Sequence, residues 1–227
     1  MQLKDPRADL CRTFVIATSL KAGGAVRMRS FGTRDADPFD ACIWQVARAT
    51  TAAPTYFLPI EIDHVLYGDG GTGWNNPTKE AIEEALSIWP NRPIGILVSL
   101  GTGLEEALQL KDSSEKVPRV VQSFLQNTAP KYAFQVAVAE YAVNCLTSCE
   151  LIHREITARA DREILEGNYF RLNVPQGMSA IGLDEWEKLG TIKALTERYM
   201  DSGDKKKDKR RIAELLQNPQ RACRFSG

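Results

Sequence analysis

The chain has 227 residues, of which 43% are hydrophobic and 26% charged, with 29 basic residues against 29 acidic ones. This length and composition indicate one globular domain and disfavour collagen, coiled coil and disorder. The five cysteines are irregularly spaced, which disfavours a disulfide scaffold and suits a reducing compartment. No apolar run approaches the ~20 residues of a membrane-spanning helix, and the N-terminus lacks the apolar core of a signal peptide, so we expect a cytoplasmic protein.

Two strands and a helix are predicted in the first 50 residues. Residues 12–20 form an apolar run typical of a buried strand, and residues 25–31 alternate like a half-exposed strand, so the Gly23-Gly24 pair between them indicates a hairpin. Asp37 and Pro38 supply a helix N-cap and first helical residue, with the apolar positions Cys42, Ile43, Val46 and Ala47 following at helical spacing. The small side chains of residues 49–54 allow backbones to approach closely, and Pro54 ends the helix.

The stretch from Val65 to Pro77 is the centre of the predicted architecture. An apolar strand ends in Asp69, which glycines flank, and Asn76 and Pro77 then begin a helix as N-cap and first residue. We expect the glycines to adopt positive φ, so that Asp69 projects into the crevice beyond the strand end, where open α/β sheets bind ligands. The alternative is an Asx-type turn without chemistry.

The next elements indicate a parallel crossover. Residues 78–89 form a helix with the apolar stripe Ala81, Ile82, Ala85, Leu86 and Trp89, and residues 94–100 form a continuous apolar strand expected to be covered on both faces. A strand, a helix and a strand in this order predict a right-handed parallel crossover. The turn at residues 101–103 would then lie at the same sheet edge as Asp69.

The remaining chain is predicted to be mainly helical. Residues 117–164 have helical periodicity, residues 168–174 form a strand, and Asp184 with Glu187 makes a capping box for a helix that ends at Met200. The last 27 residues hold eight Lys or Arg against four Asp or Glu. We interpret residues 201–227 as a basic, solvated and unpacked tail, with contact to anionic lipid or nucleic acid as the alternative.

Four other patterns are considered and set aside. Residues 68–73 match G-x-G-x-x-G, but Trp74 and two asparagines separate them from the helix, and an acid in the loop would repel phosphate. Ser99 lies inside an apolar strand with Leu97 where a nucleophile elbow needs glycine, so we interpret it as structural. Neither His64 nor His153 has a nucleophile beside it in sequence. Cys145, Cys149 and His153 share a helical face, but ordinary half-buried residues explain them better than zinc.

Four motifs in order carry a family resemblance. WQVARATTAAPTYF at residues 44–57, DGG at 69–71, NNP at 75–77 and SLGTG at 99–103 resemble the patatin-like phospholipase family, especially its fungal members. The resemblance covers roughly residues 10–200, with Thr51 where the family usually has serine. It implies a three-layer α/β/α fold with a mostly parallel central sheet.

The resemblance also implies a chemistry. Members are serine acyl hydrolases that use a Ser-Asp dyad without histidine on phospholipid, galactolipid or acylglycerol esters. Asp69 stands at the catalytic aspartate, and Gly70 and Gly71 complete the D-G-[GA] motif. A carboxylate is a weak base, so it would need to be partly withdrawn from water and held within hydrogen-bond reach of the serine. A lipid ester substrate and peripheral membrane contact follow, and we expect no cofactor, no metal and no nucleic-acid partner.

The family's oxyanion loop G-G-G-x-[RK]-G and nucleophile elbow G-x-S-x-G do not occur in these 227 residues. We therefore expect residues 1–200 to be the C-terminal portion of the domain, lacking the strands that carry both motifs and the nucleophile, and inactive alone. The missing N-terminal half, or another protein chain, would be needed to complete the sheet, because a lost strand leaves an apolar edge exposed. The alternative is a non-catalytic interaction or regulatory remnant.

Overall fold

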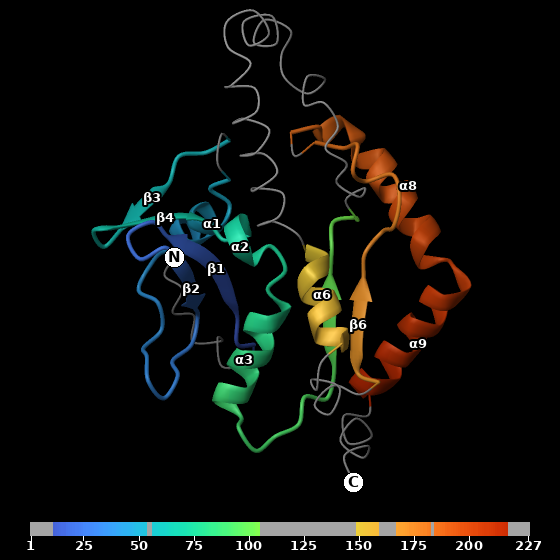
Figure 1. Cartoon of the computed structure of the whole chain (residues 1–227), viewed down its shortest axis with the longest axis horizontal. Helices are drawn as coiled ribbons and strands as arrows, with labels where there is room; N and C mark the ends of the chain where they lie inside the picture. Colours follow the sequence, from blue (N-terminus) through green and yellow to red (C-terminus); the bar gives the residue numbers. More distant parts are fainter. Residues whose placement is uncertain (1–10, 54–55, 105–148, 159–166, 183, 218–227) are drawn as a thin grey trace, which may run out of the picture. The chain divides into compact units, whose positions relative to one another are not determined.

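The computed structural model describes residues 11–53, 56–104, 149–158, 167–182 and 184–217 (Figure 1). The chain divides into two compact units. Among the described residues, the first unit comprises 11–53 and 56–88, and the second comprises 89–104, 149–158, 167–182 and 184–217. Helices and strands occur together in each unit, so the predicted α/β class is confirmed at this level.

The first unit contains a four-stranded antiparallel sheet in the order β2-β1-β4-β3. Its strands are β1 (Phe14–Ser19), β2 (Gly24–Arg29), β3 (Ile60–Ile62) and β4 (Val65–Asp69). The predicted β1–β2 hairpin and the strand that ends at Asp69 are confirmed, whereas β3 was not predicted. Among the described residues of this unit, the helices are α1 (Ile43–Thr50), the short, distorted α2 (Gly71–Trp74) and α3 (Thr78–Ile88).

One face of this sheet packs against α1 (Figure 1). The shared core is formed by small and medium-sized side chains: Ala17, Met28, Ala41, Val46, Ala49, Ile62 and Tyr67. Phe39 packs edge-on against Tyr67, with ring centroids 5.9 Å apart. The core therefore joins β1, β2, β3 and β4 to the helix that precedes the Asp69 strand.

The opposite face of the sheet is joined to α3 by ion pairs. Because side chains alternate along a strand, Arg27 and Arg29 of β2 point away from the core residue Met28. Arg29 donates two hydrogen bonds to the Glu84 carboxylate, from Nε to Oε1 at 2.5 Å and from Nη2 to Oε2 at 2.8 Å. Arg27 donates to Glu80 at 2.7 Å, Glu83 at 2.6 Å and Glu84 at 3.3 Å.

Glu84 is buried because this network satisfies its charge. Glu84 is only 3% exposed, and it was not among the residues predicted to form the buried stripe of α3. The hydrogen bonds from Arg29 hold the pKa of Glu84 below its ordinary value of 4.5, and the charges of Arg29 and Arg27 add to this effect. Burial alone would act in the opposite direction. Ile82 of the predicted stripe is buried, but Trp89 is 41% exposed.

The second unit is built on a two-stranded parallel sheet of β5 (Leu97–Leu100) and β6 (Tyr169–Leu172). Its helices are α6 (Cys149–Ala158), the 3-10 turn η3 (Trp186–Lys188), α8 (Leu189–Met200) and α9 (Gly203–Gln217). The predicted β6 strand and the helix end at Met200 are confirmed. Helix α6 lies over the sheet face that presents Tyr169 and Arg171, since His153 and Glu150 bond to them.

Several predictions for individual elements are wrong. Asp37 and Pro38 do not begin a helix, because Phe39 N donates to Arg29 O and extends the edge of β2; α1 starts later, where the side chain of Gln45 caps Cys42 N. Its apolar face is also shifted: Val46 and Ala49 are buried and Ile43 is 44% exposed. In β5 only Ser99 is buried and Leu100 is 73% exposed, so this strand is not covered on both faces.

The C-terminal part of the described chain also differs from expectation. Residues 203–217 form helix α9 instead of an unpacked tail, with Leu215 buried and Lys205 over the ring of Tyr199 at 5.7 Å. The capping box of Asp184 and Glu187 is replaced by η3, because Trp186 N donates to the main-chain oxygen of Asp184. Residues 105–148 of the predicted helical region lie outside the described residues.

The predicted mostly parallel central sheet is found only in part. Among the described residues, parallel pairing occurs between β5 and β6, whereas every pairing of β4 is antiparallel. The crossover from β4 through α3 to β5 remains a prediction, because β4 and β5 belong to different units. The division into a domain at 1–200 and a tail at 201–227 also remains a prediction.

Replacing Glu84 with glutamine should destabilise the first unit at neutral pH by roughly 3–5 kcal/mol, because two guanidinium groups lose a buried counter-ion. A carboxyl group with a lowered pKa stabilises the fold above its unfolded pKa, and this contribution disappears as the pH falls through the folded pKa. The difference between the wild type and E84Q should therefore shrink on acidification below 4.5, the ordinary pKa. Thermal unfolding at several pH values measures both effects.

Glu83→Gln is the matched control, because Glu83 bonds to the same Arg27 but its side chain is 50% exposed. Its cost should stay below about 1 kcal/mol, the usual value of an exposed ion pair. Equal losses in E83Q and E84Q would show that burial of the network contributes nothing.

The turn between β3 and β4 offers a stabilising substitution. Asp63 and His64 both have positive φ, +49° and +60°, as the two central residues of a type I′ hairpin turn do. His64→Gly should raise the stability of the chain by about 0.5–1 kcal/mol, because glycine adopts this conformation without a Cβ penalty. His64→Ala removes the same side chain but keeps the Cβ, so thermal unfolding should show no gain; an equal gain would locate the effect in the imidazole.

Candidate functional site

The main chain of Asp69 is fixed by β1 and by the segment after α1. It pairs with Ala17 of β1, and its N–H donates to Ala52 O just beyond α1 at 3.3 Å. The hydroxyl group of Thr18 donates to its carbonyl oxygen at 2.8 Å. Because Asp69 is opposite Ala17, its side chain lies on the α1 face of the sheet. The small residues before Pro54 allow the close approach that was predicted, since Ala49 and Ala52 are almost fully buried.

The carboxylate of Asp69 is half-buried and its two oxygens differ. Oδ1 accepts a hydrogen bond from Gly71 N at 2.6 Å, which is the Asx-type turn considered as the alternative to chemistry. Oδ2 has no hydrogen-bond partner among the described residues. The turn therefore orients the carboxylate with one oxygen and leaves the other free to accept a hydrogen bond.

Gly70 is required by space and not by positive φ, which corrects our expectation. Its φ is −66° and its ψ −22°, and in this turn only Gly73 has positive φ, +100°. A Cβ at residue 70 would lie 2.1 Å from the carbonyl oxygen of Ile16. At Gly71 a Cβ would lie 3.1 Å from Asp69 Oδ1. Glycine at position 70 thus lets the backbone just after β4 lie against the backbone of β1.

The helix after this turn begins as predicted. Asn76 is buried, and its side-chain oxygen accepts from Thr78 N at 3.2 Å. Ala81 N donates to Pro77 O at 2.9 Å. Asn76 is therefore the N-cap of α3, and the Asp69 turn is held between a strand and a capped helix.

Within the described residues of the first unit, no side-chain hydroxyl is hydrogen-bonded to the Asp69 carboxylate. Thr51 replaces a serine that is usual in the family's 44–57 motif. It is exposed and donates to Ala47 O at 2.8 Å. Ser99 is buried in the second unit, where its hydroxyl accepts from Arg171, in agreement with a structural role. The side chain of His64 is 95% exposed in the hairpin turn between β3 and β4.

The SLGTG turn after β5 contacts the side chains of Arg171 in β6 and of Asn173 just after β6. Asn173 accepts from Gly103 N at 2.7 Å, and Arg171 donates to Ser99 Oγ at 3.0 Å. A Cβ at Gly101 would lie 2.4 Å from the side-chain oxygen of Asn173. Gly103 has φ +124°, and a Cβ there would lie 2.2 Å from Met178. The placement of this turn at the same edge as Asp69 remains a prediction, because the two lie in separate units.

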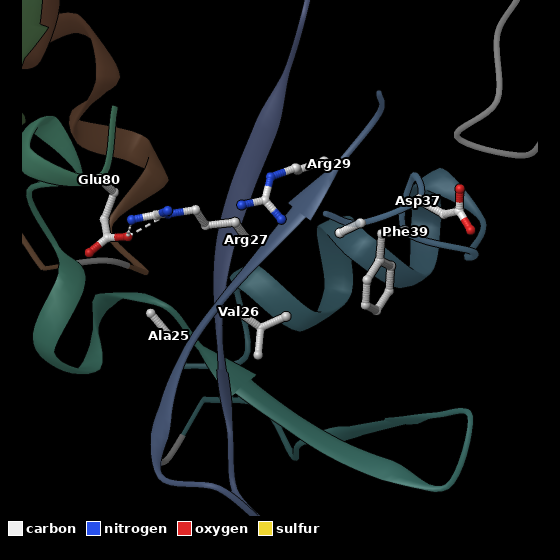
Figure 2. Close-up of a pocket in the computed structure, with 8 residues that line it drawn as sticks. Ala25, Val26, Arg27, Arg29, Asp37, Phe39 and Glu80 are labelled. Carbon is white, nitrogen blue, oxygen red and sulfur yellow. Dashed lines mark hydrogen bonds and ion pairs between the residues drawn. The ribbon is translucent and has the colours of Figure 1, made fainter. Parts of the chain in front are cut away.

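A hollow of about 430 Å³ lies on the outer edge of the first sheet (Figure 2). It is lined by residues of β2, α3 and the segment before α1: Ala25, Val26, Arg27, Arg29, Ala36, Asp37, Phe39 and Glu80. Strand β1 separates β2 from the Asp69 strand, so this hollow is distinct from the Asp69 turn. Its arginines are engaged by glutamates, which disfavours an anionic ligand.

The zinc triad considered from the sequence lies only partly within the described residues. Cys145 of the considered zinc triad lies outside the described residues, and His153 Nδ1 is 3.0 Å from the Tyr169 hydroxyl. Within the described ranges, no group of three or more His, Cys, Asp or Glu is arranged to hold a metal ion. The same ranges contain no helix with the length and apolar character needed to cross a bilayer.

Comparison with known proteins identifies the family of this chain. The sequence model described as patatin-like phospholipase matches residues 10–82, which include the sheet, α1 and the Asp69 turn. Calcium-independent phospholipase A2-gamma of Rattus norvegicus is 31% identical over 176 residues, or 77% of this chain. The chain belongs to the patatin-like phospholipase family. The 85/88 kDa calcium-independent phospholipase A2 of the same organism is 29% identical over 202 residues.

A plant relative matches a shorter region of this patatin-like chain. Phospholipase A I of Arabidopsis thaliana is 44% identical over 61 residues, which are 27% of this chain and 5% of that protein. The chain spans about a fifth of the length of the two rat relatives, 20% and 23%. Their names describe lipid hydrolases, and the Asp69 turn lies in the region that the family model matches.

Gly70→Ala should destabilise this patatin-like chain by about 1–3 kcal/mol or more, because the new methyl group overlaps Ile16 O and the two strands must separate. Gly68→Ala is the matched control in the same strand: its Cβ would meet only Leu20 Cδ2, at 3.5 Å, so stability should change by less than about 0.5 kcal/mol. Chemical unfolding of both variants tests the comparison. Equal stability of G70A and G68A would contradict the close approach.

Proposed function

We propose that this chain carries the general-base half of a Ser-Asp lipid acyl hydrolase, with Asp69 as the base. The single observation that carries the proposal is the asymmetry of its carboxylate: Oδ1 is held by Gly71 N, and Oδ2 has no partner among the described residues. A base must be oriented and must also keep one oxygen available for the proton that it accepts. The family and the names of its relatives support a phospholipid or acylglycerol ester as substrate.

Asp69 would activate a serine that these 227 residues do not supply in a G-x-S-x-G motif. In the proposed reaction the serine hydroxyl attacks the ester carbonyl while its proton moves to Asp69 Oδ2. Protonated Asp69 then returns this proton to the departing alcohol, and water releases the acyl group in the second half-reaction. Backbone N–H groups of a glycine-rich loop would stabilise the tetrahedral oxyanion. We propose that a segment with both motifs completes the sheet as well as the site.

A non-catalytic regulatory role is the second candidate. It is favoured by the Asx-type hydrogen bond itself, because Asp69 stabilises the turn whether or not it takes part in chemistry. The two candidates differ in whether the charge of Asp69 is needed. Asparagine retains the oxygen that accepts from Gly71 but cannot act as a base, so Asp69→Asn separates them.

A chimera tests the hydrolase proposal. The segment of rat calcium-independent phospholipase A2-gamma that corresponds to residues 10–82 is replaced by residues 10–82 of this chain, and hydrolysis of a fluorogenic phospholipid is measured. The chimera should hydrolyse the lipid, and Asp69→Asn should lower the rate by about 10²–10⁴-fold, the usual contribution of a general base. Circular dichroism should show an unchanged fold in this variant.

Asp63→Asn in the same chimera is the control, because Asp63 is an exposed residue in the hairpin turn before β4. Its rate should equal that of the parent chimera. A folded chimera without hydrolysis, or Asp69→Asn with full activity, would contradict the role of Asp69. The 227-residue chain alone should not react with a fluorophosphonate probe, since its candidate serine Ser99 is buried.

A further inference from the structure

Large apolar side chains are exposed around Arg48 in the first unit. Trp44 is 63% exposed, Phe57 57%, Leu58 81% and Tyr56 48%. We call these four residues together with Arg48 the Arg48 patch. Single exposed apolar residues are common, but several together mark a surface that contacts another protein or a membrane.

Arg48 contacts two members of the patch, Phe57 and Leu58. Trp44 and Arg48 are four residues apart in α1 and therefore lie on the same side of the helix. The guanidinium group of Arg48 lies over the Phe57 ring at 4.9 Å and donates to Leu58 O at 2.6 Å. The segment after α1 is thus fixed against the helix, with its aromatic and aliphatic side chains still facing outward.

The patch is linked to the Asp69 turn by backbone hydrogen bonds. Phe57 N and Tyr56 N both donate to Ala53 O, at 3.0 and 3.1 Å, and the preceding Ala52 accepts from Asp69 N. Two adjacent residues, Ala52 and Ala53, therefore bond to the patch segment and to the proposed base. A partner bound to this patch would therefore lie close to Asp69.

The composition of the patch fits the boundary between lipid and water. Tryptophan and tyrosine are enriched at this boundary because each has an apolar ring and a polar atom, and arginine reaches phosphate with its charged end. Arg48 Nη1 is covered and has no hydrogen-bond partner among the described residues. Because this nitrogen is covered, Arg48 offers the lipid surface its charge and not a free donor.

We infer that the Arg48 patch docks on the surface of a phospholipid bilayer, with Trp44, Phe57 and Leu58 entering the headgroup region. The inference rests on the proposed function and deepens it, because an enzyme that cleaves lipid esters must work where these molecules aggregate. Leu58, the most exposed member, inserts its side chain, and the positive charge of Arg48 lies beside the anionic headgroups. Docking by this patch brings the Asp69 turn to the surface that holds the substrate.

Vesicle sedimentation with the full 227-residue chain tests the inference. The vesicles contain ether-linked phosphatidylcholine with a minor fraction of ether-linked phosphatidylglycerol, so that hydrolysis cannot alter them. The wild type should sediment with vesicles and stay in the supernatant without them. Leu58→Asp and Trp44→Ala should each lower the partition coefficient by about tenfold or more, the effect of losing one buried apolar side chain.

Two residues of the second unit provide matched controls. Trp186 is 71% exposed and Leu189 62% exposed, so Trp186→Ala and Leu189→Asp make the same chemical changes at comparable exposure. Their partition coefficients should change by less than about twofold, within the range of a surface substitution away from the interface. Circular dichroism of all four variants verifies that the fold is retained.

Three results would overturn the inference. The first is a wild-type chain that does not sediment with vesicles, and the second is an equal loss in the patch and control variants. The third is a change in the size-exclusion profile of the patch variants without vesicles, which would assign the patch to contact between copies of the chain. An active chimera with no vesicle binding contradicts only the docking surface, whereas vesicle binding with an inactive chimera contradicts only the proposed hydrolysis.

Discussion

The first unit depends on one close approach, between the backbone of Gly70 and the carbonyl group of Ile16. A Cβ in this position would be 2.1 Å from the carbonyl oxygen, so the backbone just after β4 can lie against β1 only without a side chain. Once the strands meet at this distance, Thr18 can bond to the main chain of Asp69 from one side and Ala52 from the other. The carboxylate is therefore placed by packing of the backbone, before any of its own contacts are considered.

The two faces of the first sheet are stabilised by different forces. The α1 face buries apolar side chains, whereas the α3 face is held by two arginines and three glutamates. Burial of Glu84 is tolerated because Arg29 and Arg27 compensate its charge, whereas Glu83 at the rim remains open to water. Apolar packing positions the strand that carries Asp69, and the ion pairs position the helix that follows it.

Local patterns in the sequence predict the elements of the first unit well. The β1–β2 hairpin, the strand before Asp69 and the Asn76 cap depend on alternation, glycine and an amide side chain, all of which act over a few residues. The Asp37-Pro38 helix start failed because a tertiary hydrogen bond from Phe39 to Arg29 overrides the local preference. Burial of Glu84 could not be predicted, since its partners lie more than 50 residues away along the chain.

The residues of the candidate site were predicted from the sequence, but their contacts were not. Asp69 and its glycines were found from the sequence, but the reason for glycine was misassigned to positive φ, because a clash with Ile16 depends on a strand about 50 residues earlier. The roles of Thr18 and Ala52 have no sequence signal of their own, since each contributes a contact to the main chain of Asp69. Family resemblance supplied the chemistry, which periodicity and spacing do not encode.

The steric requirement at Gly70 has a consequence for how this family diverges. Selection for a foldable sheet preserves glycine at this position even after selection for hydrolysis has ended, since any larger residue would separate two central strands. An aspartate-glycine pair at the end of such a strand thus records ancestry and architecture. Whether a homologue is an enzyme must be decided from the residues that face its carboxylate.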